Sequence, residues 1–396
     1  MRLKKYDWPR AMPPLYLIYA LMMCCFSSIS SARVILSLFA LDLDATPSAV
    51  GLLVATFYAF PLVLSWPVGV LSDRLGSRWL LLFGAAGGTC GMLIPYFFRT
   101  LPALYVAGFA LGLAFTFYNV LLQNLVGIIS TPQNRTRNFS NSSMFGAASL
   151  FAGPLIGGIA IDYSGHAIAC LFSAALSCTA IALLLFFGNV LPGGQRHAAP
   201  RGRVRDMLND PGMLRILLIS GLVQMGQDLF QVFLPIYGHG VGLSASAIGA
   251  ILASFAAAFV VIRIFMPRMI AALGEEKLLA YSFYVSAAGF MLMPFFRGEI
   301  TLMLVAFMFG CGMGCGQPIT TMLLFNRSAE GRSGETFGVR QTANNVVRVT
   351  TPSVFGYIAT LLGLFSVFGI GALLMAAGGL LTGLRKNRPP AAHPPA

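Results

Sequence analysis

Long apolar runs alternate with short polar segments along the whole chain of 396 residues. An α-helix that crosses a bilayer needs about 20 consecutive apolar residues, and twelve runs meet this length. The sequence therefore predicts an all-α membrane protein with twelve transmembrane helices. We expect these at 15–40, 48–70, 79–98, 102–127, 141–161, 166–188, 213–236, 246–265, 277–296, 300–325, 336–360 and 363–384.

The charge of the chain follows this layout. Only 10% of the residues are charged and 57% are hydrophobic, with a formal net charge of +13. Most Lys and Arg residues fall in the segments that share a side with the N-terminus, and cytoplasmic loops are rich in these residues. We therefore expect both termini in the cytoplasm and no nucleic-acid partner. We expect a multi-pass protein of the cell membrane. The short loops and the lack of outer disulfides favour a bacterial inner membrane.

Residues suited to covalent or metal chemistry do not form a recognisable constellation. All seven cysteines lie inside apolar runs, and no Cys/His spacing suggests a zinc site. No nucleophile–base pairing or nucleotide-binding loop stands out. We expect no metal, no cofactor and no enzymatic activity, with a membrane-embedded enzyme or a non-transporting membrane sensor as the remote alternative.

An internal repeat divides the chain. At an offset of 198 residues, 48–51 (SAVG) matches 246–249 (SAIG), and Gly76 and Pro154 fall on Gly274 and Pro352. The repeat predicts two pseudo-symmetric six-helix halves, 1–190 and 213–384. Between them lies a cytoplasmic linker, 191–212, rich in Pro, Gly and Arg, and after them a disordered cytoplasmic tail, 385–396.

The loop between the second and third predicted helices carries the most specific motif. Its sequence, GVLSDRLGSR over 69–78, resembles the signature G-x-x-x-D-R-x-G-x-R of the major facilitator superfamily (MFS). The resemblance implies the MFS fold, with alternating access around a substrate site near the bilayer midplane. It also implies that Asp73 helps to close the cytoplasmic side. The gating residues that it implies are Gly69, Asp73, Arg74, Gly76 and Arg78.

The fifth predicted helix carries a second MFS-like feature. Gly153, Pro154, Gly157 and Gly158 resemble the end of a motif that the family often shows in exporters. Small residues allow helices to approach closely, so we expect these four positions to take part in gating. Ser140 and Ser149 depart from the upstream part of the motif.

Polar residues inside apolar runs are the candidates for binding, because they are costly in a membrane. Gln224, Gln227, Asp228 and Gln231 follow the spacing i, i+3, i+4, i+7 and thus share one helix face. Asp228 is the one acid well inside a predicted span, so it is the candidate for proton coupling. The alternative is a polar network that only fixes helix packing.

Arg33 lies one repeat before Gln231, at matching depth in the other half. We predict an ion pair between Arg33 and Asp228, with snorkelling of Arg33 to the outer surface as the alternative. We expect Arg340 to lie near the cytoplasmic interface. The remaining candidates for substrate binding are Asn119, Gln123, Gln317, Asn345 and Arg348.

Two features common in proton-coupled drug exporters of the MFS are absent. The fourth predicted helix has amides instead of an arginine, and the first has Arg33 instead of an acid. We predict a monomeric secondary transporter that exports a small organic solute across the cytoplasmic membrane in exchange for protons. The alternative is uptake or exchange of an organic anion held by Arg33 and Arg348, since guanidinium groups bind carboxylates and phosphates in bidentate fashion.

Overall fold

The computed structural model describes residues 13–131, 134–192, 210–327 and 333–383, and their regular structure is helical. The helices are α1 (Pro14–Asp42), α2 (Pro47–Leu75), α3 (Ser77–Phe97), α4 (Leu101–Ile129), α5 (Arg135–Phe187), α7 (Pro211–Gly240), α8 (Ala245–Leu273), α9 (Glu275–Leu292), α10 (Glu299–Arg327), α11 (Ser333–Leu362) and α12 (Leu364–Gly383). Two short 3-10 turns, Gly188–Val190 and Met293–Phe295, follow α5 and α9.

Helix α5 contains both the fifth and the sixth predicted spans. Its 53 residues are interrupted at Gly165, where φ is 78° and ψ is 166°. This left-handed backbone conformation is readily open only to glycine, so one residue joins two helical limbs without a loop. With the two limbs counted separately, the described residues confirm the twelve predicted helices.

Ten of the helices within the described ranges are long and apolar enough to cross a membrane, with α5 counted once. Helix α11 does not reach this threshold, although it lies in the C-terminal bundle beside α2 and α7. The reason is its polar composition, which includes Arg340, Asn344, Asn345 and Arg348.

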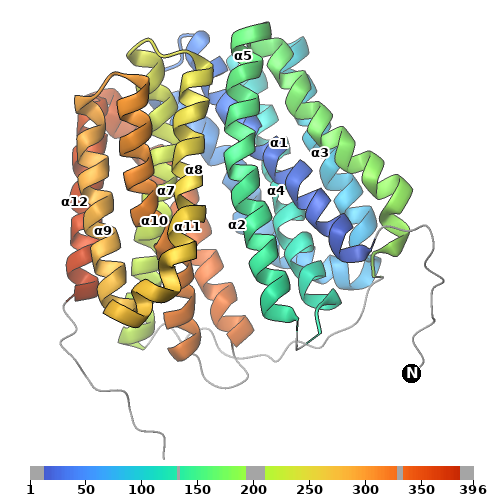
Figure 1. Cartoon of the computed structure of the whole chain (residues 1–396). Helices are drawn as coiled ribbons and strands as arrows, with labels where there is room; N and C mark the ends of the chain where they lie inside the picture. The colour runs from blue at the N-terminus through green and yellow to red at the C-terminus, as the bar shows by residue number, and fades with distance from the viewer. Residues whose placement is uncertain (1–12, 132–133, 193–209, 328–332, 384–396) are drawn as a thin grey trace, which may run out of the picture.

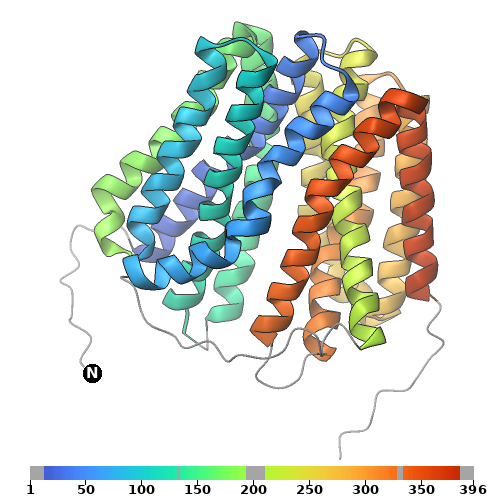
Figure 2. The same ribbon diagram turned by 180° about the vertical axis from the view of Figure 1, so that it is seen from behind.

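The helices form two groups that lie side by side in both views (Figures 1 and 2). Helices α1–α5 form the N-terminal bundle and helices α7–α12 form the C-terminal bundle. The division into domains at 1–190 and 213–384 stays a prediction. Most of the predicted linker and all of the predicted C-terminal tail lie outside the described residues.

The bundles touch most closely at the end where α1 gives way to α2, which we name the α1–α2 end. There α2 packs on α11, and α5 packs on α8. A Cβ atom on Gly51 would lie 2.2 Å from the carbonyl oxygen of Pro352, and one on Gly249 would lie 2.4 Å from that of Pro154. Glycine is therefore required at both crossings. Toward the opposite end α2 and α11 diverge (Figure 2).

The signature loop lies at that opposite end. Gly76 has φ 80° and ψ 156°, and its repeat partner Gly274 has φ 80° and ψ 160°, so both halves use glycine for the same turn. Arg78 donates hydrogen bonds from Nε to the carbonyl oxygen of Leu184 at 3.2 Å and from a terminal nitrogen to that of Leu185 at 3.1 Å. The side chains of Asp73 and Arg74 lie outside the described part, so their gating role stays a prediction.

The other glycines of the two motifs differ in how closely they are packed. A Cβ on Gly153 would lie 2.5 Å from Cβ of Ser30, and one on Gly158 would lie 2.3 Å from the carbonyl oxygen of Ala245. Gly157 would place its Cβ 3.0 Å from Oγ of Ser31, whereas Gly69 has only an ordinary contact at 3.8 Å. Gly153 and Gly157 thus join α5 to α1, while Gly158 joins the two bundles.

Candidate functional site

One face of α7 carries the polar residues at the centre of the molecule. Gln224, Gln227 and Asp228 are all buried, with exposed fractions of 3%, 9% and 3%. The face continues to Ser220, which is fully buried, and to the half-buried Gln231. The spacing of these residues on a helix places them in one stripe, as the sequence predicts.

Gln224 is the hub of the network around Asp228. Its Nε2 donates to Oδ2 of Asp228 at 3.0 Å. Its Oε1 accepts from Nε2 of Gln317 at 3.1 Å and from a terminal nitrogen of Arg348 at 3.3 Å. An ionised carboxylate only accepts and a guanidinium only donates, so the amide of Gln224 fits between them in this orientation alone.

Arg340 extends the network to α10, against the expectation of an interfacial position. Only 4% of Arg340 is exposed. It donates to Oγ of Ser220 at 2.7 Å and to Oγ1 of Thr321 at 2.7 Å, and it also contacts Oε1 of Gln317. Burial of an arginine without a carboxylate partner is tolerated only if its donors are hydrogen-bonded, and these neutral acceptors meet that need.

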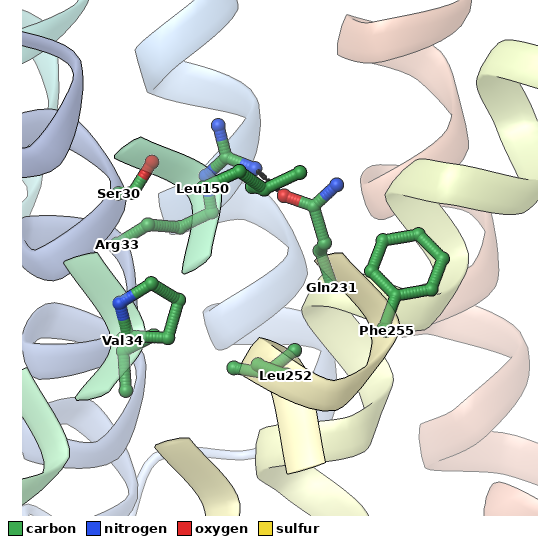
Figure 3. Close-up of a pocket in the computed structure, with 8 residues that line it drawn as sticks. Ser30, Arg33, Val34, Leu150, Gln231, Leu252 and Phe255 are labelled. Atoms are coloured by element: carbon green, nitrogen blue, oxygen red, sulfur yellow. Dashed lines mark hydrogen bonds between the residues drawn. The ribbon is translucent and has the colours of Figure 1, made fainter. Parts of the chain in front are cut away.

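Arg33 contacts the C-terminal bundle through Gln231. A terminal nitrogen of Arg33 donates to Oε1 of Gln231 at 2.5 Å, across the boundary between the bundles (Figure 3). The two residues are separated by 198 positions, the offset of the internal repeat. They face a small cavity of about 10 Å³, roughly the space for one water molecule. Its lining is Ser30, Arg33, Val34, Leu150, Pro154, Gln231, Leu252 and Phe255.

Tyr58 of α2 lies between two guanidinium groups. The Cζ atoms of Arg33 and Arg348 are 5.5 Å and 5.3 Å from the centre of its ring. Arg348 also lies 6.0 Å from the ring centre of Phe115. The Nε atoms of Arg33 and Arg348 are buried and have no hydrogen-bond partner. These donors are available to an anionic or carbonyl-bearing group that enters between the bundles.

The predicted ion pair between Arg33 and Asp228 is not formed. The ion pairs among the described side chains include His166–Asp42 and Arg327–Asp210, and neither involves Arg33 or Asp228. Arg33 bonds to Gln231 and Asp228 bonds to Gln224, so amides take up both charged groups.

The other predicted binding residues fall into two groups. Asn345 donates from Nδ2 to the carbonyl oxygen of Pro61 at 3.3 Å, which links α11 to α2, and its Oδ1 has no partner. Gln227 is also buried, and its Nε2 has no partner. Asn119 is half-buried and Gln123 is exposed, and no hydrogen bond joins either side chain to the network of the described residues.

Sequence reasoning missed Tyr58 and Arg263, and it placed Arg340 at the interface although this residue is buried. Tyr58 is one of 12 tyrosines, and nothing in its neighbourhood along the chain distinguishes it. Arg263 is visible as an arginine within an apolar run, which is the signal that could have found it. Arg263 is half-buried, lies 5.7 Å from the ring centre of Phe259, and has an unpartnered Nε.

Metal ligation and disulfide formation find no support among the described side chains. No group of three or more His, Cys, Asp or Glu residues in the described ranges could hold a metal ion. The seven cysteines are all free. The polar cluster around Gln224 and Asp228 instead offers hydrogen-bonding and charged groups that come from both bundles.

Comparisons with known proteins agree with this arrangement. The model of the Major Facilitator Superfamily matches residues 15–239 and 216–396. The multidrug resistance protein MdtG of Klebsiella pneumoniae (strain 342) is 23% identical over 351 residues, which cover 86% of this chain and 84% of that protein. MdtG of Salmonella paratyphi A is 24% identical over 350 residues, with coverages of 85% and 86%.

Solved structures share the fold at low sequence identity. The peptide transporter POT in complex with sulfate superimposes with a TM-score of 0.77 and 14% identity, over 96% of this chain and 95% of that chain. The nucleoside transporter NupG gives a TM-score of 0.75 and 12% identity, with coverages of 95% and 100%. The predictions of an MFS fold and of a transporter instead of an enzyme are therefore confirmed. This chain belongs to the Major Facilitator Superfamily.

Proposed function

We propose that this protein exports a small organic solute across the cytoplasmic membrane in exchange for protons that bind at Asp228. The observation that carries the proposal is the place of this carboxylate. Asp228 is 3% exposed, the only buried acid among the described side chains, and it lies in the polar cluster that faces the other bundle. Relatives at 23% and 24% identity are named multidrug resistance proteins, which favours export.

The network around Asp228 suggests how a proton would act on the site. An ionised Asp228 accepts a charge-assisted hydrogen bond from Gln224, which also holds Arg348. Protonation removes the negative charge, weakens this bond and leaves Arg348 and Arg33 without an opposing charge. The contacts of α7 and α11 with the N-terminal bundle then differ in strength between the two protonation states, so protonation shifts the equilibrium between the conformations of the transporter.

The closed α1–α2 end suggests which state of the cycle this is. Loop charges predict that the N-terminus is cytoplasmic, which places the α1–α2 end outside. Tight glycine crossings join the bundles at that end, and α2 and α11 diverge toward the cytoplasmic side. In this orientation the structure represents a state that is closed to the outside.

A second candidate, uptake or exchange of an organic anion, is favoured by the arginines. Arg33 and Arg348 face the same ring of Tyr58, and each has a free, buried Nε. With Arg340 included, three arginines of the cluster face one carboxylate. A carboxylate or phosphate group would find both charge and unpaired donors at this position.

The sign of the pH dependence of binding separates the two candidates. In the export candidate the solute and the proton compete for Asp228. A cationic solute does so most directly, so its affinity rises with pH. An anion binds better when Asp228 is neutral, so its affinity falls as pH rises. The experiment is a thermal-unfolding series of the purified protein between pH 5.5 and pH 8.5. Tetraphenylphosphonium and salicylate serve as the two probes, because a ligand that binds the folded state raises the melting temperature.

Matched variants assign the effects to residues. Stabilisation by tetraphenylphosphonium that grows with pH and disappears in Asp228→Asn would support the export proposal. Stabilisation by salicylate that shrinks with pH and disappears in Arg348→Gln would support the anion candidate instead. Stabilisation that is unchanged in Asp228→Asn at every pH would contradict a role for this carboxylate in coupling.

A further inference from the structure

At the α1–α2 end, each bundle receives the beginning of a helix from the other bundle. The first residues of α8 lie against Gly158 of α5, and the first residues of α2 lie against Gly356 of α11. A Cβ atom on Gly158 would lie 2.3 Å from the carbonyl oxygen of Ala245, and one on Gly356 would lie 3.0 Å from that of Pro47. Gly158 and Gly356 are one repeat apart, so the two contacts are pseudo-symmetric.

Asp162 binds the N-terminus of α8 from the opposite bundle. Its Oδ1 accepts from the backbone N–H of Ala245 at 3.0 Å, and its Oδ2 accepts from that of Ser246 at 2.8 Å. The first N–H groups of a helix have no partner within the helix. The N-cap Ser244 satisfies only the N–H of Ala247, at 3.1 Å. The carboxylate thus supplies the two bonds that α8 itself lacks.

Thr360 does the same for α2 with a single bond. Its Oγ1 accepts from the backbone N–H of Ser48 at 3.1 Å. The N-cap Thr46 accepts from the N–H of Ala49 at 3.3 Å. The first residue of α2 is Pro47, which has no N–H to satisfy. One acceptor is therefore sufficient at this site.

The acceptors match the donors at both sites. Asp162 and Thr360 are one repeat apart, as are Ala245 and Pro47. Where the first helical residue offers an N–H, the partner is a carboxylate with two acceptor atoms. Where that residue is proline, the partner is a hydroxyl with one bond. The match indicates that these side chains serve the contact between bundles and are not merely surface residues.

We propose that Asp162 and Thr360 are two latches that hold the bundles together at the α1–α2 end, and that both release when this end opens during transport. The Asp162 latch is the stronger of the two, because its negative charge also interacts favourably with the positive N-terminal end of the α8 dipole. The latches act on the conformational step, so they do not depend on the solute or on proton binding at Asp228.

Hydrogen exchange of the full-length protein in lipid nanodiscs tests the proposal directly. The amides of Ala245 and Ser246 are protected by Asp162, so a peptide that spans 244–248 reports the latch. In Asp162→Ala we expect these amides to exchange about fivefold faster, the effect of losing a typical helix cap. Asp162 does not contact the start of α2. Amides in a peptide that spans 46–50 should therefore exchange faster in Asp162→Ala only if the whole α1–α2 end opens more often.

Spin labels separate release of the bundles from local fraying. The exposed residues Ile168, in the N-terminal bundle, and His239, in the C-terminal bundle, take the labels in a background without native cysteines. Asp162→Ala should shift the distance distribution toward longer separations. Faster exchange at 244–248 with an unchanged distance distribution would overturn the latch, because Asp162 would then only cap α8.

A transplant provides the matched control. Pro47→Ala together with Thr360→Asp rebuilds the carboxylate latch at α2, with two donors facing two acceptors. In the Asp162→Ala background this pair should return the spin-label distances toward those of the wild type, whereas Thr360→Val should lengthen them further. The proposal would also be overturned if the rebuilt latch did not shorten the spin-label distances and Thr360→Val did not lengthen them, in variants that unfold at the wild-type temperature.

Discussion

The two bundles share a backbone plan and differ in their chemistry. The glycines at the crossings, Gly51 and Gly249, occupy equivalent positions, and so do Gly76 and Gly274 at the turns. The polar network has no such equivalence. One repeat before Gln224, Asp228 and Arg348 the N-terminal bundle has Phe26, Ser30 and Leu150.

The pseudo-symmetric crossings give both pairs of helices, α2 with α11 and α5 with α8, the same close packing. The charge and the amides are concentrated on α7, α10 and α11. Under the proposed function, this difference separates movement, which both bundles share, from binding and coupling, which belong mainly to the C-terminal bundle. The N-terminal bundle contributes Arg33, the ring of Tyr58 and the carbonyl oxygen of Pro61.

The largest effect is expected at Arg340, whose equivalent is Ser142. Arg340→Met removes the donor to Ser220, Thr321 and Gln317; the two hydroxyl groups still donate to Asn344 and to the carbonyl oxygen of Gln317, but Oε1 of Gln317 is left without a partner. The lost hydrogen bonds to the charged group and the unsatisfied amide oxygen cost about 1–3 kcal/mol, so we expect a loss of about 3 kcal/mol in the free energy of unfolding. Ser142 only donates to the carbonyl oxygen of Phe139 in its own helix, at 3.0 Å. Ser142→Ala should cost less than about 1 kcal/mol. Denaturant or thermal unfolding that shows equal losses would contradict the asymmetry.

The next effect concerns coupling. In Asp228→Asn we expect the pH dependence of solute binding to be lost, a change of about 5- to 150-fold across the titration if coupling has its usual size. Transport in proteoliposomes with and without a pH gradient provides the measurement. Ser30→Asp in this background places a carboxylate at the equivalent position in the N-terminal bundle. It should not restore coupling, because Phe26 replaces the partner Gln224, and Leu150 replaces Arg348, which bonds to Gln224. Restoration would show that the surrounding network is dispensable.

A smaller effect, and one that should be equal in both bundles, is expected at the glycine crossings. Gly51→Ala and Gly249→Ala each place a methyl group against a backbone carbonyl oxygen. Overpacking of this kind costs about 1–3 kcal/mol in the state closed at the α1–α2 end. Gly87 is the control, because a Cβ there would meet nothing within 4 Å. Spin-label distances should lengthen in the first two variants and stay unchanged in Gly87→Ala.

The smallest effect is expected at the start of α7. Arg327 donates to both oxygens of Asp210 at 2.6 Å and 2.8 Å, and this ion pair lowers the pKa of Asp210 to about 2. The unfolded value is about 3.9, so the stabilisation is complete above that pH and is lost as pH falls toward 2. The difference in melting temperature between wild type and Asp210→Asn should therefore shrink between pH 5 and pH 2.5. A difference that stays constant over this range would contradict the role of the ion pair.

The sequence predicts the helices and the polar face of α7 well, for physical reasons. A bilayer requires apolar runs of fixed length, and helical spacing determines which residues share a face. The repeat places Arg33 and Gln231 at the same depth, and these two residues are in contact in the structure. These features can be predicted because each depends only on the residues of a single helix or on the offset of the internal repeat.

Pairing between helices could not be predicted in the same way. The contact between Gln224 and Asp228 is an i, i+4 pair within α7, but whether Arg33 also reaches Asp228 depends on the rotation of α1 and α7 about their axes. The burial of Arg340 depends on hydroxyl groups of α7 and α10, and the place of Tyr58 depends on how α2 crosses α11. Equal spacing along the chain carries no information about these rotations.

The polarity of α11 has a consequence for how the protein is made. A charged residue near the middle of a helix costs about 2.5–3.5 kcal/mol on insertion into the membrane, and α11 carries two arginines and two asparagines within nine residues, 340–348. Alone in lipid, such a segment would not remain inserted. Its partners Ser220, Gln224, Gln317 and Thr321 belong to α7 and α10, which are synthesised first. Those two helices therefore have to be in place to receive α11, and the polar network around Gln224 is completed only when this late segment enters the bundle.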